Sequence, residues 1–151
     1  YRFARRSTGE ALTGETDLYL ADTLGEMGLF LRLADVVVMG GSFAPALNLP
    51  PVGGHNPLEP ARLGKPGVTG PDAGNCLELT RRLVGSGGLV QVQIPGDLPA
   101  VIAPLLADPA AAKAAGERAR RAAQDAGSGL ETLWTGLQPL LPPKPVKRRG
   151  R

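Results

Sequence analysis

Cysteine, histidine and aromatic residues are all scarce in this chain of 151 residues. Cys76 is the single cysteine, so no disulfide forms within the chain, and a reducing compartment suits it. His55 is the single histidine and lies 21 positions from Cys76, whereas a zinc site needs about four ligands, or three and a water. Trp, Tyr and Phe make up 4% of the residues, too few for stacking nucleic-acid bases. These shortages argue against a zinc site and against nucleic acid as a partner.

Positive charge is also scarce over most of the chain, although the net charge is +3. Residues 142–151, Pro-Pro-Lys-Pro-Val-Lys-Arg-Arg-Gly-Arg, hold five of the 17 basic residues and no acidic residue. The rest of the chain carries 12 basic and 14 acidic residues, a net charge of −2. We predict that residues 142–151 are a disordered, solvated tail. The alternative is a weak contact between this tail and an anionic membrane surface.

Long apolar runs and two common nucleotide-binding motifs are missing as well. No run approaches the roughly 18 apolar residues of a transmembrane helix, so we expect this part of the protein to be soluble. Neither Gly-x-Gly-x-x-Gly nor Gly-x-x-x-x-Gly-Lys-Ser/Thr occurs, which argues against a standard dinucleotide fold and a P-loop ATPase. The chain begins with Tyr rather than Met. We therefore expect residues 1–16 to be the edge segment of an incomplete domain.

Short apolar runs alternate with helical patterns along residues 17–141. This order is typical of a parallel sheet with helices on both faces, so the predicted fold class is α/β and Rossmann-like. The expected strands cover residues 16–21, 36–39, 66–69 and 89–92. The expected helices cover residues 24–33, 56–64, 74–84, 97–106, 109–126 and 130–140. Thr23 and Glu26 have the spacing of a capping box at the start of the first helix.

Residues 53–60, Gly-Gly-His-Asn-Pro-Leu-Glu-Pro, are the most informative segment. Two glycines allow a sharp turn and a close approach to a ligand. Asn56 suits a helix N-cap, Pro57 the first helical position and Glu59 the third. A loop that leads into a helix start offers backbone N–H groups to an anion, phosphate above all. The alternatives are that Glu59, like Glu26, only caps a helix, and that His55 only orients the loop.

Glycine-bearing polar loops follow three of the expected strands. They are residues 22–26 after the first strand, 40–42 and 53–59 after the second, and 70–75 after the third. In parallel sheets, ligands bind beyond the carboxyl ends of the strands. Backbone amides suit a phosphate, and a nearby carboxylate suits the hydroxyl groups of a ribose. The sequence therefore predicts a nucleotide site at this edge of the sheet.

Six motifs occur here in an order that resembles the C-terminal half of bacterial 3-deoxy-D-manno-octulosonic acid (Kdo) transferases. They are Asp-Thr-Leu-Gly-Glu-Met-Gly-Leu at 22–29, Leu-Ala-Asp-Val at 33–36, Gly-Gly-Ser at 40–42, Gly-Gly-His-Asn-Pro-Leu-Glu-Pro-Ala at 53–61, Gly-Lys-Pro at 64–66 and Gly-Pro at 70–71. The resemblance extends from about residue 17 to residue 75, and the later expected helices are compatible with it. It differs in two places: ten residues, 43–52, separate the two glycine motifs, and Asp72-Ala-Gly-Asn-Cys76 stands where the family usually has His-x-x-Asn-Phe.

The resemblance implies one half of a GT-B glycosyltransferase, which has two Rossmann-like domains. Such an enzyme moves Kdo from CMP-Kdo to a lipid A precursor at the cytoplasmic face of the bacterial inner membrane, in lipopolysaccharide biosynthesis. Residues 17–141 would be the domain that binds the CMP-sugar donor. The general base, the acceptor site and the membrane anchor would lie in an N-terminal domain outside this sequence. No catalytic residue is therefore expected in this chain, and we expect the chain alone to be inactive.

The resemblance also implies donor contacts, which fall on ten residues. They are Gly25, Glu26, Gly40, Gly41, Ser42, Gly54, His55, Asn56, Glu59 and Asn75. Asn56 would face the phosphate and Glu59 the ribose hydroxyl groups, and neither a metal nor another cofactor is implied. Two alternatives stay open from the sequence: a non-catalytic nucleotide-binding or interaction module, and a related transferase that uses a UDP-sugar.

Overall fold

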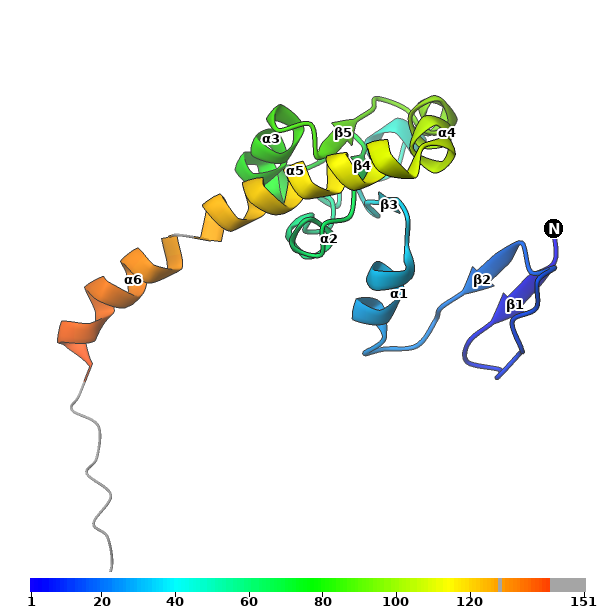
Figure 1. Ribbon diagram of the computed structural model, residues 1–151, viewed down its shortest axis with the longest axis horizontal. Helices are drawn as coiled ribbons and strands as arrows, with labels where there is room; N and C mark the ends of the chain where they lie inside the picture. Colours follow the sequence, from blue (N-terminus) through cyan, green and yellow to red (C-terminus); the bar gives the residue numbers. More distant parts are fainter. Residues whose placement is uncertain (128, 142–151) are drawn as a thin grey trace, which may run out of the picture. The chain divides into compact units, whose positions relative to one another are not determined.

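A computed structural model describes residues 1–127 and 129–141 (Figure 1). Its internal contacts divide the chain into two units, Tyr1–Ala34 (unit 1) and Asp35–Arg151 (unit 2). The predicted basic tail, residues 142–151, lies outside the described residues.

Unit 1 contains two short parallel strands and one helix. Strand β1 (Phe3–Arg5) pairs with strand β2 (Leu18–Leu20). The first strand expected from the sequence, residues 16–21, therefore pairs with β1 and does not join the sheet of the later strands, so the expectation of one four-stranded sheet was wrong. Residues 1–16 contain β1. This strand has only three residues and ends with an arginine, so the sequence does not reveal it.

Helix α1 (Met27–Leu33) begins later than expected. Gly25 has a φ of 87°, a left-handed conformation that cannot be part of a right-handed helix. The carboxylate of Glu26 contacts the Thr23 hydroxyl and also binds Arg6, so the two residues do not form the predicted capping box. The Tyr19 and Phe30 rings, whose centroids are 6.1 Å apart, pack α1 against β2.

Unit 2 contains a three-stranded parallel sheet. Its strands are β3 (Val37–Val38), β4 (Gly67–Thr69) and β5 (Leu89–Gln91), in the order β3-β4-β5. Val37 lies opposite Gly67, which lies opposite Leu89. A 3-10 turn, η1 (Pro45–Leu47), and helix α2 (Leu58–Arg62) connect β3 to β4. A second turn, η2 (Gly74–Cys76), and helix α3 (Leu77–Gly85) connect β4 to β5. The predicted α/β class with parallel strands is confirmed.

The remaining elements of unit 2 follow β5. They are η3 (Pro95–Asp97), α4 (Leu98–Ala107), α5 (Pro109–Gly127), α6 (Gly129–Leu137) and η4 (Gln138–Leu140). Asp108 caps the N-terminus of α5, because its Oδ1 accepts hydrogen bonds from the N–H groups of Ala110 (2.9 Å) and Ala111 (3.0 Å).

Helix α5 runs past α2 and α3 (Figure 1) and closes the core of unit 2. The buried core cluster combines Met39, Ala61, Leu83, Leu89, Ala119, Ala122 and Ala123. Alanines on the inner face of α5 keep that face flat, so the helix lies close to its neighbours. The core therefore fixes α2, whose first residues are the last residues of the glycine motif at 53–60.

No individual helix in the described ranges has both the length and the hydropathy to cross a membrane. The segments Pro95–Ala107 and Pro109–Asp125 meet those two criteria only as a pair, and they are bent by 108° at their junction.

Candidate functional site

Ser42 joins the loop after β3 to the loop after β4. Its side chain is fully buried, and its hydroxyl donates to the Met39 carbonyl oxygen (2.7 Å) and accepts from the Gly70 N–H (2.8 Å). The Ser42 carbonyl oxygen accepts from the Asp72 N–H at 3.0 Å. Ser42 in this structure therefore holds the two loops together and presents no side-chain atom to a ligand.

His55 connects the glycine motif to the end of β3. Its N–H donates to the Gly40 carbonyl oxygen at 3.0 Å. The imidazole lies against Gly40, where an added Cβ would be 3.0 Å from His55 Cδ2. A side chain at residue 40 would therefore displace the ring, although His55 itself is exposed.

Asp72 and Asn75 hold the glycine turn in front of α2. One carboxylate oxygen of Asp72, Oδ2, accepts from the N–H groups of Val52 (3.0 Å) and Gly53 (2.8 Å). The Asn75 side-chain amide donates to the Val52 carbonyl oxygen (3.0 Å), and the Asn75 N–H donates to the Gly53 carbonyl oxygen (3.1 Å). The predicted site residue Asn75 thus contacts the loop itself.

Helix α2 begins at Leu58, two residues after the start expected from the sequence. Asn56 Oδ1 accepts from the Leu58 N–H at 2.9 Å, so its side chain binds the first residue of α2, although Pro57 and not Asn56 occupies the N-cap position. Glu59 lies in the first turn and is exposed, with no partner within residues 1–127 and 129–141. Because α2 has only five residues, its dipole is small, and individual N–H groups of the loop matter more than the helix.

Several backbone donors of this loop cluster are free to bind a ligand. In the part of the chain that the structure describes, the N–H groups of Gly41, Gly54 and Asn56 have no acceptor. The exposed His55 imidazole and the exposed Glu59 carboxylate come from the same segment. Free N–H donors together with one carboxylate suit a ligand that carries both a phosphate and hydroxyl groups.

Gly25 and Glu26, the other predicted site residues, belong to unit 1. The Glu26 carboxylate accepts from the Arg6 guanidinium through Nε (3.0 Å) and Nη2 (2.7 Å). These bonds, together with the Thr23 hydroxyl, lower the pKa of Glu26 from 4.5 to about 2. Glu26 is therefore ionised at neutral pH, and its negative charge is paired with Arg6.

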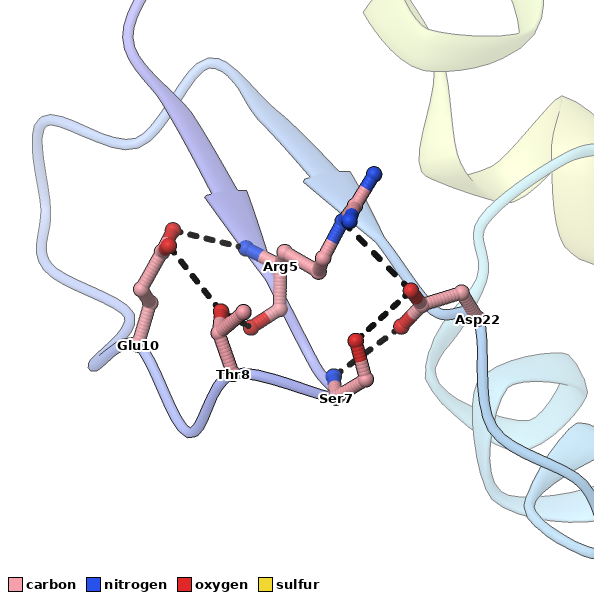
Figure 2. Close-up of polar contacts among 5 residues, drawn as sticks. All are labelled: Arg5, Ser7, Thr8, Glu10 and Asp22. Carbon is pink, nitrogen blue, oxygen red and sulfur yellow. Dashed lines mark hydrogen bonds and ion pairs between the residues drawn. The ribbon is translucent and has the colours of Figure 1, made fainter.

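A second polar cluster lies at the carboxyl ends of β1 and β2 (Figure 2). Asp22 accepts from the Ser7 N–H (2.9 Å) and from the Ser7 hydroxyl (2.8 Å), and lies 3.4 Å from Arg5 Nε. The bond from the Ser7 hydroxyl is the main reason why the pKa of Asp22 is below its usual value. On the other side of β1, Glu10 accepts from the Arg5 N–H at 2.9 Å.

Arg5, Arg6 and Ser7 are the polar residues that sequence analysis did not single out. The signal available was the pair Arg5-Arg6 directly after the short run Tyr-Arg-Phe-Ala. The partners Asp22 and Glu26 are 15 to 20 positions away in the sequence. Only the parallel pairing of β1 with β2 brings them together.

We expect Arg6→Ala to raise the pKa of Glu26 from about 2 toward 4.5. In the wild type, the Arg6–Glu26 contribution to stability is present above pH 4.5 and is lost as pH falls through about 2, because the folded-state pKa is the lower one. An NMR titration of the Glu26 carboxyl carbon measures this pKa directly. Arg5→Ala is the control, since Arg5 lies beside Asp22 and not beside Glu26. A Glu26 pKa that stays near 2 in Arg6→Ala would contradict the ion pair.

The fold class is that of one Rossmann-like half of a GT-B glycosyltransferase. The chain is similar to the crystal structure of the C-terminal CMP-Kdo binding domain of WaaA from Acinetobacter baumannii, with a TM-score of 0.74 and 31% sequence identity. The match covers 82% of this chain and 61% of that chain. No protein-family model matches.

Curated relatives give the same result. The chain is 36% identical over 97 residues to the 3-deoxy-D-manno-octulosonic acid transferase of Haemophilus influenzae, a match that covers 64% of this chain and 21% of the relative. It is 35% identical over 141 residues to the 3-deoxy-D-manno-octulosonic acid transferase of Bordetella pertussis, a match that covers 89% of this chain and 32% of the relative. The chain is thus a relative of the Kdo transferases and corresponds to part of their C-terminal domain. It spans between a fifth and a third of the length of these two relatives.

Proposed function

We propose that this chain binds the nucleotide of CMP-Kdo and is the donor-binding portion of a Kdo transferase. The observation that carries the proposal is the similarity to a CMP-Kdo binding domain, at a TM-score of 0.74 and 31% identity. The free N–H groups and the exposed carboxylate at the carboxyl ends of β3 and β4 support it. The full enzyme would transfer Kdo to a lipid A precursor at the cytoplasmic face of the inner membrane.

The loop residues would have separate roles in holding the donor. The N–H groups of Gly41, Gly54 and Asn56 would donate to the phosphate oxygens, where charge-assisted hydrogen bonds are strongest. The Glu59 carboxylate would accept from the ribose hydroxyl groups, and His55 would contact the donor beside Gly40. That Gly25 and Glu26 also contact the sugar-nucleotide donor stays a prediction.

The chemistry of transfer would depend on stabilising the departing nucleotide. As the bond between Kdo and CMP breaks, the sugar gains oxocarbenium character and negative charge develops on the CMP phosphate. Fixed N–H donors stabilise such charge without reorganising. The transfer would invert the anomeric centre and would need no resident metal. The base that activates the acceptor would lie outside this chain, and the basic residues of 142–151 would add contact with an anionic membrane surface.

We expect CMP to bind this chain more tightly than UMP or CDP in calorimetric titrations. Cytosine and uracil differ in the hydrogen-bonding groups of their ring edges, and a mismatched buried group costs about 1–3 kcal/mol. The expected preference for CMP over UMP is therefore about tenfold or more. Equal affinities, or no binding to folded protein, would overturn the proposal, and a preference for UMP would point to a UDP-sugar.

A further inference from the structure

We propose that Asp72 is a positioning residue for the donor nucleotide, because it fixes the glycine turn 52–54, which carries the free N–H group of Gly54 and leads into Asn56. The inference rests on the proposed function. It assigns to Asp72 an indirect role, in which the carboxylate shapes the binding loop and does not itself contact the ligand.

The carboxylate of Asp72 is committed to the turn. Its Oδ2 accepts from two consecutive N–H groups, those of Val52 and Gly53, at 3.0 and 2.8 Å. The bond from Gly53 is the main reason why the pKa of Asp72 is below its usual value, with further contributions from the N–H groups of Val52 and Gly74. The carboxylate is therefore charged at neutral pH, and its charge is directed at the protein backbone.

The main chain of Asp72 fixes the next residue of the same turn. An added Cβ on Gly54 would lie 2.5 Å from the Asp72 carbonyl oxygen, so the two backbones are in direct contact. Asp72 is itself anchored to the end of β3, because its N–H donates to the Ser42 carbonyl oxygen at 3.0 Å. Residue 72 thus connects the buried Ser42 junction to the turn that precedes His55 and Asn56.

The turn 52–54 needs the hydrogen bonds of Asp72 because of the segment that precedes it. Val52 is the last residue of the ten-residue segment 43–52, whose own turn η1 ends at Leu47. Leu49 and Val52 are exposed, so side-chain packing does not hold the end of this segment. The hydrogen bonds that Asp72 accepts and Asn75 donates hold it in place, and they set where Gly54 and Asn56 lie.

The test compares Asp72→Ala, Asp72→Asn and the control Asp35→Ala. Asp35 is an exposed acid that precedes β3, at the opposite end of the strands, so its variant matches the charge change. We expect Asp72→Ala to weaken CMP binding about tenfold, because two charge-assisted bonds are lost. Asp72→Asn keeps an acceptor oxygen and is expected to recover most of the affinity, and Asp35→Ala is expected to bind as the wild type does.

A second measurement separates positioning from general damage to the fold. Amide hydrogen exchange by NMR should accelerate at Val52 and Gly53 strongly in Asp72→Ala and to a smaller extent in Asp72→Asn, because the neutral amide oxygen is a weaker acceptor than the carboxylate, while exchange in β4 stays unchanged. If Asp72→Ala does not fold, exchange in Asp72→Asn decides, and unchanged rates at Val52 and Gly53 would overturn the inference. Wild-type affinity in a folded Asp72→Ala would also overturn it, but would leave the proposed function standing. Absence of CMP binding by the wild type would instead overturn the proposed function, and this inference with it.

Discussion

Gly54→Ala is expected to weaken CMP binding by about a hundredfold, the largest effect of any single change in the loop. Gly54 has a φ of +66°, and its added Cβ would lie 2.5 Å from the Asp72 carbonyl oxygen. The left-handed conformation costs a residue with a Cβ about 1–2 kcal/mol, and the clash is with backbone that cannot rotate away. The turn must therefore move, and a displacement of about 1 Å in a binding constellation can cost a hundredfold.

Gly74→Ala is the matched control for this prediction. Gly74 lies in the same loop cluster, but its added Cβ would have only ordinary contacts, at 3.8 Å with Asp72 Oδ1 and 3.9 Å with the Gly53 Cα. Calorimetric titration of both variants with CMP measures the difference, and circular dichroism checks that both are folded. Affinity within threefold of the wild type in Gly54→Ala would show that the turn does not form the binding site.

The sequence predicts unit 2 well because its signals are local. The run Val-Val-Val-Met at 36–39 is apolar and β-branched, and it contains β3 (Val37–Val38). The expected strands 66–69 and 89–92 contain β4 and β5 in the same way. Prolines and glycines at the ends of these runs mark where each element stops.

Unit 1 was predicted less well because its contacts are not local. β1 has three residues, and its partner β2 begins 13 positions after β1 ends. The helix start at residues 23–26 was placed too early, since no local rule shows that Arg6 binds the Glu26 carboxylate. An ion pair between residues 20 positions apart outweighed the capping-box pattern.

The candidate site shows the same division between local and tertiary signals. The rule that ligands bind at the carboxyl ends of parallel strands predicts which loops form the candidate site, and the hydrogen bond from the Leu58 N–H to Asn56 depends on neighbouring residues alone. What the sequence could not show is that Ser42, Asp72 and Asn75 use their polar atoms on neighbouring loops. These bonds depend on the register of β3 against β4. The donor contacts of the ten predicted residues stay predictions.

Gly116→Ala is expected to destabilise unit 2 by about 3 kcal/mol or more, even though alanine has the better helix propensity by about 1 kcal/mol. Gly116 lies in α5 where that helix crosses the end of α2. An added Cβ would lie 1.9 Å from the Gly64 carbonyl oxygen and 2.7 Å from its carbon. That turn is held in place, because the Gly64 N–H donates to Ala61 and the Lys65 N–H donates to Pro60, both at 3.0 Å. Helix α5 must therefore move outward.

An outward shift of α5 would also separate it from the sheet. Ala119, one turn along the same helix, already lies 2.4 Å from the position of an added Cβ on Gly88, so the two backbones are in close contact there. Urea denaturation followed by circular dichroism measures the loss, with Gly85→Ala in α3 as the control, since nothing lies within 4 Å of its added Cβ. An unchanged denaturation midpoint in Gly116→Ala would show that α5 does not pack on α2 as described. Because α5 also fixes the helix that begins at the candidate site, we expect Gly116→Ala to weaken CMP binding as it loosens the core.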